Sequence, residues 1–214
     1  MNVLKLTEIL NEISKTSLTN SDEVDRAGLL LEKSVLNVID QMLDTEREQV
    51  LTDVIKGNHL QQLQALYEIY ETNLENRFVE NLLSHSIDPS LRSYLMYDRF
   101  VRLIKNEIDL AKIDNSQKIA FIGSGPLPIT ALLLNQLTGC KVDCYEHYLP
   151  AAQISRTLIE KFGVQDDISV IHEPGQQINA KQYSTVVVAL LAKPKKSILA
   201  QLATTKSEDT SIVC

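Results

Sequence analysis

The residues best suited to chemistry are Gly123, Ser124 and Gly125, which directly follow an apolar run. Glycines at such a place let the chain turn tightly and let a ligand approach the backbone closely. In a doubly wound sheet a turn of this kind follows the first strand, at the edge where these folds bind ligands. A dinucleotide fingerprint would have a third glycine at position 128, where this chain has Pro128. The turn therefore predicts a nucleotide-like ligand that does not need the full fingerprint.

The residues around the turn narrow the choice of ligand. Pro126 and Pro128 have no N–H, so the start of the following helix offers fewer donors to a pyrophosphate than usual. This disfavours NAD and FAD and favours an adenosine ligand without a phosphate, of which S-adenosylmethionine (SAM) is the common one. Glu146 ends the next apolar run about 20 residues later, where an acid accepts hydrogen bonds from ribose hydroxyls. A glycine turn that serves only helix–strand packing is the alternative.

Two side chains of the first half could act on a substrate. Glu71 falls on the margin of an apolar stripe at helical spacing, where a partly desolvated carboxylate can bind an ammonium group and accept its proton. A surface glutamate at the edge of a core is the alternative. Tyr97 lies on the apolar side of the next helix, where its hydroxyl could position an amine and its ring could face a sulfonium. A core tyrosine fits that pattern equally well.

A third candidate, Glu107, falls between Phe100 and Leu103 on the wheel of the same helix. A buried acid needs a partner, so we expect an ion pair with an arginine such as Arg99 or Arg102, or a contact with substrate. The structural interpretation is the one that we favour.

The elements that must position these residues differ between the two halves of the chain. Up to about residue 112 apolar residues recur at helical spacing, which predicts an all-helical N-terminal domain over residues 1–112. Its last helix is expected to begin with Asp88 as N-cap and Pro89 at the first helical position. The other helices are expected around residues 6–13, 24–42 and 63–82.

After the polar segment 111–117, short apolar runs alternate with helical segments, which predicts a parallel sheet covered on both faces. The fold class is therefore α/β, with a SAM-binding Rossmann-like doubly wound sheet over residues 113–214. We expect the sheet to be cut short after its fifth strand, at Cys214. The expected strands are 118–123, 141–146, 168–172, 184–192 and 210–214, and the expected helices are 126–137, 149–163 and 194–206.

Composition excludes several classes of protein. A formal net charge of −7 without a basic run argues against nucleic-acid and membrane-surface partners. No stretch approaches the ~20 apolar residues of a membrane span, and the N-terminus does not resemble a signal peptide. We therefore expect a cytoplasmic protein. The four histidines lack zinc spacing and the cysteines fit buried thiols, so we expect no metal. Whether the chain forms a homodimer stays open.

Three stretches resemble the nicotianamine synthase family, including its bacterial branch that makes opine-type metallophores such as staphylopine. The most specific is FIGSGPLPIT, residues 121–130. SYLMYDRFVRLIKNE, residues 93–107, resembles the family's tyrosine-rich helix, with Tyr97 and Phe100 at its aromatic positions and Glu107 at its later acid. YEIYETNLENRF, residues 67–78, resembles its acidic helix, with Glu71 and Glu75 at the glutamates.

This resemblance implies a reaction and a set of site residues. Family members move the 3-amino-3-carboxypropyl group of SAM, a co-substrate, onto an amine and release methylthioadenosine; in the bacterial branch the acceptor is histidine. The implied catalytic residues are Glu71 and Tyr97. The family's acid after the third strand corresponds to Glu173, or is replaced at Gly175. The implied SAM contacts are Gly123, Ser124, Gly125, Pro126, Leu127, Glu146, His147, Glu173 and Ala189.

Two other functions stay open on the sequence. An ordinary SAM-dependent methyltransferase acting on a small molecule would use the same glycine turn and acid. A catalytically inactive SAM-binding partner protein would use its helical half as a docking surface. The sulfur product separates the first of these from the transferase, because methyl transfer leaves S-adenosylhomocysteine.

Overall fold

The structure is a computed structural model, and it describes residues 3–33, 42–57, 59–84 and 90–214. The chain forms two compact units, Met1–Glu75 and Asn76–Cys214. Their division falls within the long helix α5 (Leu60–Ser84) and groups α6 (Tyr97–Ala111) with the sheet. The domain boundary predicted between residues 112 and 113 is placed where the apolar periodicity changes, not by contacts between residues. It therefore stays a prediction.

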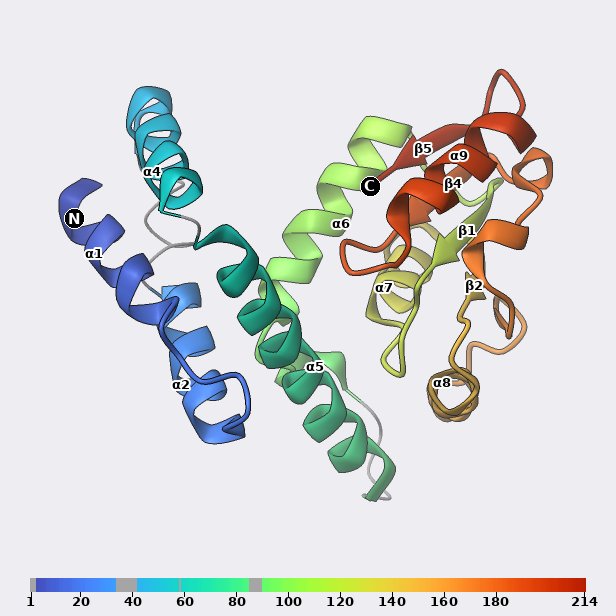
Figure 1. The fold of residues 1–214 in the computed structure, drawn as a ribbon. Coiled ribbons are helices and arrows are strands. Elements are labelled where there is room, and N and C mark those ends of the chain that lie inside the picture. The colour runs from blue at the N-terminus through green and yellow to red at the C-terminus, as the bar shows by residue number, and fades with distance from the viewer. Residues whose placement is uncertain (1–2, 34–41, 58, 85–89) are drawn as a thin grey trace. The chain divides into compact units, whose positions relative to one another are not determined.

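The first unit is built from helices (Figure 1). They are α1 (Val3–Ile13), α2 (Ser21–Leu31), α4 (Asp44–Lys56) and the first part of α5. The sequence pattern did not predict α4, because the buried residues among its described side chains, Val50 and Val54, make only a weak stripe. The helix predicted over residues 24–42 ends at Leu31 in its described part, and residues 34–41 lie outside the described residues.

Close packing fixes α2 against α5 in this unit. A Cβ atom added to Gly28 would lie 2.2 Å from Cγ of Tyr70, so the ring lies directly on the backbone of α2. Tyr70 is 2% exposed and Leu66, one turn before it, is fully buried. Asn20 begins α2 by accepting hydrogen bonds from the amides of Asp22 and Glu23. The two helices are therefore held at a short distance.

The helix that carries Tyr97 begins later than the sequence predicted. Asp88 and Pro89 lie outside the described residues. Ser90 caps only a short 3₁₀ turn, Leu91–Ser93, and Tyr94 then has an extended backbone with φ −70° and ψ 129°. The α-helix α6 starts at Tyr97, so the expected start at residues 88–89 is wrong.

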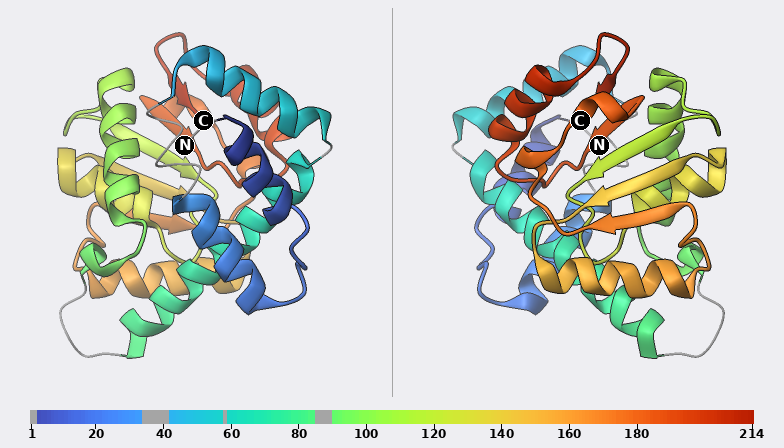
Figure 2. Two further views of the ribbon diagram at one scale, coloured as in Figure 1. Left: turned by 90° about the vertical axis from the view of Figure 1, so that its left-hand side faces the viewer. Right: turned by 90° about the vertical axis from the view of Figure 1, so that its right-hand side faces the viewer.

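The second unit contains a five-stranded parallel sheet of order β3-β2-β1-β4-β5. The order reverses between β1 and β4, which is where doubly wound folds bind ligands. Figure 2 shows α6 and α7 on one face of the sheet and α9 on the other. This confirms the predicted fold class. The strands are β1 (Lys118–Ile122), β2 (Lys141–Tyr145), β3 (Ile168–Ile171), β4 (Thr185–Val188) and β5 (Ser211–Val213), and the helices are α7 (Ile129–Thr138), α8 (Leu149–Lys161) and α9 (Lys195–Thr205).

β4 is shorter than the apolar run that predicted it. The strand ends at Val188, and the amide of Ala192 then donates to the carbonyl of Ala189 at 3.1 Å, which closes a turn. The run 184–192 is apolar because its strand part is fully buried and its turn part lies beside the glycine turn. Apolar character alone does not separate these two environments.

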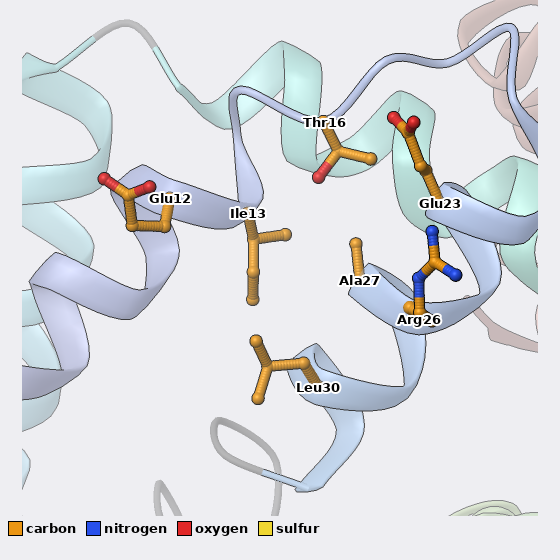
Figure 3. A pocket seen from close by; sticks show the side chains of 7 residues that line it. All are labelled: Glu12, Ile13, Thr16, Glu23, Arg26, Ala27 and Leu30. Atoms are coloured by element: carbon orange, nitrogen blue, oxygen red, sulfur yellow. The ribbon is translucent and has the colours of Figure 1, made fainter.

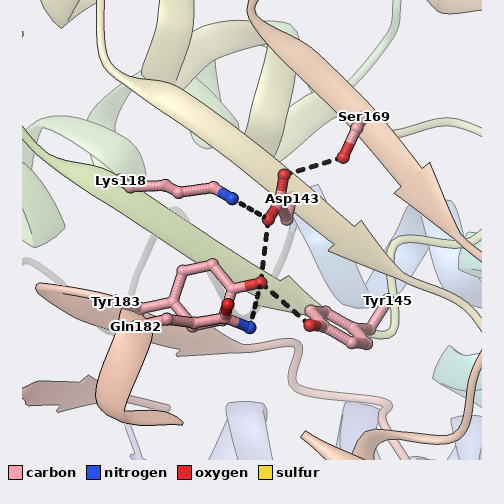
Figure 4. A network of polar contacts seen from close by, with 6 residues as sticks. All are labelled: Lys118, Asp143, Tyr145, Ser169, Gln182 and Tyr183. Carbon is pink, nitrogen blue, oxygen red and sulfur yellow. Dashed lines mark hydrogen bonds and ion pairs between the residues drawn. The ribbon is translucent and has the colours of Figure 1, made fainter. Parts of the chain in front are cut away.

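A partly buried polar network crosses the α9 face of the sheet (Figure 4). Asp143 of β2 pairs with Lys118 at 2.6 Å and accepts hydrogen bonds from Ser169 at 2.7 Å and from Tyr183 at 2.8 Å. Tyr145 lies 2.8 Å from the Tyr183 oxygen and donates to it, because the proton of Tyr183 is already given to Asp143. Burial raises the pKa of Asp143, but hydrogen bonds from Lys118, Ser169 and Tyr183 outweigh it and hold that pKa below its usual value.

Candidate functional site

The glycine turn lies where the carboxyl ends of three strands meet. Gly123 and Gly125 have positive φ angles of 82° and 64°, which favour glycine at both places. The amide of Gly123 donates to the carbonyl of Tyr145 at 2.8 Å, which fixes the turn to the end of β2. A Cβ atom on Gly123 would lie 2.9 Å from Cβ of Ala192 and 3.4 Å from that of Ala189. The turn is therefore close-packed against the end of β4.

Glu146 holds this turn from the end of β2. The residue is 5% exposed, and its Oε2 accepts the Gly125 amide at 2.9 Å while its Oε1 accepts the Tyr148 amide at 2.8 Å. His147 Nδ1 lies 3.3 Å from the same Oε1. A carboxylate has about four lone-pair sites, so this one can still accept hydrogen bonds from ribose hydroxyls. The sequence indicated the ribose role but not the hold on the turn.

Few backbone donors near the turn are free for a pyrophosphate. The amides of Gly123 and Gly125 are already bonded within the protein, and Pro126 and Pro128 have none. Pro128 is also the N-cap of α7, and it provides no side-chain hydrogen bond there. This arrangement agrees with the expectation of a ligand that needs glycines but no phosphate grip.

The predicted SAM contacts differ in their exposure. Leu127 is 1% exposed and Ser124 is 4% exposed, so their side chains belong to the core in this structure. His147 and Glu173 are exposed at the ends of β2 and β3, and Ala189 is half-buried at the end of β4. The structure thus brings these three strand ends to one edge, while contact with SAM stays a prediction.

The packing around Gly175 decides which position after β3 can carry an acidic side chain. A Cβ atom on Gly175 would lie 2.4 Å from Cγ2 of Ile122, and the glycine is buried. An aspartate would not fit there without a shift of the β1 end. Of the two positions that the sequence left open, only Glu173 has room for an acidic side chain.

Tyr97 and Glu107 lie at different depths along α6. Tyr97 is half-buried at the first residue of the helix, and Glu107 follows about 15 Å further along the axis at 1.5 Å per residue. Glu107 is 9% exposed, and burial raises its pKa to about 7. Its Oε2 has no hydrogen-bond partner among the described residues. The expected ion pair with Arg99 or Arg102 is therefore wrong for the part of the chain that the structure describes.

Glu71 lies deeper than the margin of a stripe. The residue is 8% exposed, and burial, followed by the negative charge of Glu32, raises its pKa to about 7. The hydroxyl of Tyr67, one turn before Glu71 on α5, donates a hydrogen bond to Glu32. A carboxyl that titrates near neutral pH can exchange protons with an amine. The sequence identified Glu71 but not Glu32, which comes from another helix.

A separate hollow of about 280 Å³ lies between α1 and α2 of the first unit (Figure 3). No predicted site residue lines it. The hollow is lined by Glu12, Ile13, Thr16, Glu23, Arg26, Ala27 and Leu30.

The described ranges lack two other kinds of feature. Within them, no three His, Cys, Asp or Glu side chains are grouped to hold a metal ion. In the same ranges, no helix is both long and apolar enough to cross a membrane.

Comparison with curated proteins finds relatives that are named L-histidine 2-aminobutanoyltransferase or nicotianamine synthase. The chain is 30% identical over 125 residues to an L-histidine 2-aminobutanoyltransferase of Yersinia pestis, covering 58% of this chain and 47% of that protein. It is 26% identical over 111 residues to one of Pseudomonas aeruginosa, covering 51% and 42%. The chain thus spans about half the length of these curated relatives. Nicotianamine synthase 3 of Arabidopsis thaliana is 37% identical over 70 residues, covering 30% of this chain and 22% of that protein.

Solved structures share the whole fold. The structure of MtNAS in complex with MTA and tNA has a TM-score of 0.81 at 24% identity, covering 97% of this chain and 80% of that chain. A mutant of MtNAS in complex with S-adenosylmethionine has a TM-score of 0.78, with 98% and 80% covered. The family model described as nicotianamine synthase protein matches residues 1–214. The glycine turn, the acid that holds it and the helices before the sheet are therefore those of a member of the nicotianamine synthase family.

Proposed function

We propose that this protein is a transferase that moves the 3-amino-3-carboxypropyl group of SAM onto the amine of histidine and releases methylthioadenosine. The observation that carries the proposal is family membership across residues 1–214. Relatives named L-histidine 2-aminobutanoyltransferase support histidine as the acceptor. We place the reaction in the cytoplasm, in the biosynthesis of an opine-type metallophore of the staphylopine kind.

In this function, SAM binds at the edge of the sheet where the carboxyl ends of the strands lie. Gly123 and Gly125 let the ligand approach the backbone, and Glu146 accepts the ribose hydroxyls on its remaining lone pairs. Glu173 and Ala189 flank the adenosine from the ends of β3 and β4. The bonds within the turn support adenosine without a phosphate, because the amides of Gly123 and Gly125 are used internally and Pro126 and Pro128 have none.

On the acceptor side, Glu71 is the general base. The ammonium group of histidine gives one proton to the Glu71 carboxylate and becomes a neutral amine. Its nitrogen lone pair then forms the new C–N bond at the carbon that joins the aminocarboxypropyl arm to sulfur. The C–S bond breaks with its electron pair on sulfur, so the sulfonium becomes the neutral thioether of methylthioadenosine. Tyr97 positions the amine or the amino-acid arm of SAM.

The sulfur product tests this proposal. The full-length protein is incubated with SAM and histidine, and the products are separated by chromatography. We expect methylthioadenosine in a one-to-one ratio with aminocarboxypropyl-histidine. S-adenosylhomocysteine would instead identify a methyltransferase. SAM binding by calorimetry without either product would identify an inactive SAM-binding protein, and both outcomes would overturn the proposal.

A further inference from the structure

Two carboxylates from different helices lie together in the first unit. Tyr67 and Glu71 are four residues apart on α5, so their side chains project from the same side of the helix. The Tyr67 hydroxyl donates a hydrogen bond to Glu32, which follows the last residue of α2. The charge of Glu32 in turn raises the pKa of Glu71. The hydrogen bond from Tyr67 thus holds the Glu32 carboxylate toward the side of α5 that carries Glu71.

Glu71 itself is buried without a partner. The residue is 8% exposed, and none of the described residues gives its carboxylate a hydrogen bond or an ion pair. Burial of an acid beside a second acid is unfavourable unless a positive charge offsets it. A cationic group that entered this cluster would be held by both carboxylates. The cluster therefore has the chemistry of a site for a protonated amine.

We propose that Glu32, held in place by Tyr67, is the second carboxylate of the acceptor site and binds the ammonium group of the acceptor amino acid while Glu71 accepts its proton. This inference rests on the proposed transferase function and deepens it. It assigns to Glu32 and Tyr67 a role that the sequence pattern did not indicate, because α2 and α5 meet only in the fold.

Two carboxylates can hold the amine and remove its proton at the same time, which a single carboxylate cannot do. A single acid that takes the proton of the ammonium group loses the charge that held it. With a pair, Glu71 becomes neutral while Glu32 stays an anion that accepts a hydrogen bond from the remaining N–H of the amine. The lone pair of the nitrogen is then free for the new C–N bond. The pair therefore selects acceptors with a basic amine.

The decisive variant is Glu32→Gln, which keeps the shape of the side chain and removes its charge. We expect the KM for histidine to rise about 10- to 100-fold, because a hydrogen bond to a charged group is lost. The Kd for SAM should stay within about twofold of the parent, since the glycine turn is untouched. Glu80→Gln, an exposed glutamate of the same helix, is the matched control and should change neither constant.

Tyr67→Phe keeps the proposal testable if Glu32→Gln does not fold. It removes only the hydroxyl that holds Glu32, so we expect a smaller rise in the histidine KM, of about three- to tenfold. A parent enzyme that releases no methylthioadenosine with histidine would overturn the proposed function. An active parent whose Glu32→Gln and Tyr67→Phe variants keep the parent's KM would overturn this inference alone.

Discussion

The two units solve the problem of a buried acid in opposite ways. In the α/β unit, Glu146 is 5% exposed and each of its oxygens accepts a backbone amide, from Gly125 and Tyr148. In the helical unit, Glu71 is 8% exposed and lies beside a second acid, with a pKa raised to about 7. The hydrogen bonds to Glu146 fix the conformation of the glycine turn. The raised pKa of Glu71 lets its carboxyl group gain or lose a proton near neutral pH. The difference supports the proposed assignment of SAM binding to Glu146 and of proton transfer to Glu71.

The largest effect should come from Glu71→Gln, which separates the two roles. The amide keeps the shape of the side chain but cannot accept the proton of the acceptor amine. Turnover should fall by about 10²- to 10⁴-fold, as is typical of a lost general base, while the Kd for SAM stays near the parent value. Methylthioadenosine release measures the first and calorimetry the second. An undiminished rate would rule out Glu71 as the base.

A second effect should appear in the pH dependence of stability, through Glu107. Its folded-state pKa is about 7 and its ordinary value is 4.5, so the folded protein binds this proton more tightly than the unfolded chain. The resulting stabilisation is complete below about pH 4.5 and is lost as pH rises through 7. At pH 8, Glu107→Gln should therefore be more stable than the parent by up to about 3 kcal/mol.

Urea unfolding at pH 4.5 and pH 8 checks this prediction. The gain for Glu107→Gln should be present at the higher pH and small at the lower one, while Glu80→Gln should change stability by less than about 0.5 kcal/mol at both. A Glu107→Gln variant that is less stable than the parent at pH 8 would mean that the ionised carboxylate is paired there.

A somewhat smaller effect is expected for Glu146→Ala, which tests the fixed acid. SAM should bind about 10- to 100-fold more weakly, since hydrogen bonds to a charged acceptor contribute roughly 1.5–3 kcal/mol. The free energy of unfolding should also fall by about 1–3 kcal/mol, because the amides of Gly125 and Tyr148 lose their acceptor. Calorimetry and urea unfolding measure the two changes. SAM binding as tight as in the parent would remove Glu146 from the ligand site.

The smallest effect should be the response to phosphate-bearing ligands. The amides of Gly123 and Gly125 are used internally and two prolines follow, so NAD, FAD and ATP should leave the melting temperature almost unchanged. SAM should raise it in the same thermal-shift screen. A rise with NAD equal to that with SAM would show that the turn does accept a pyrophosphate.

Much of the α/β unit could be predicted because its signals are local. Gly123 and Gly125 need positive φ angles, and the acid at 146 follows a strand whose apolar run marks it. The space for a side chain at position 175 could not be predicted in this way, because it depends on Ile122 from another strand. Pattern alone left Glu173 and Gly175 equal, and the packing of β1 separated them.

The helical unit was harder to predict because its features depend on contacts between helices. The wheel placed Glu71 on a margin, but the structure buries it and sets Glu32 beside it through Tyr67. The same difficulty applies to Glu107 on α6 of the second unit, which was expected to meet an arginine but whose Oε2 has no partner among the described residues. A single helix cannot show which neighbour will cover an acid.

The polar network around Asp143 also has a consequence for strand register. A slip of β2 by one residue would turn Asp143 to the opposite face, which burial of Val142 and Cys144 already penalises. A slip by two residues would keep the faces and exchange one apolar neighbour for another. It would, however, move Asp143 away from its cross-strand partner Ser169. One partly buried acid thus disfavours the misalignment that apolar strands tolerate, and so helps to set where Glu146 lies at the edge of the sheet.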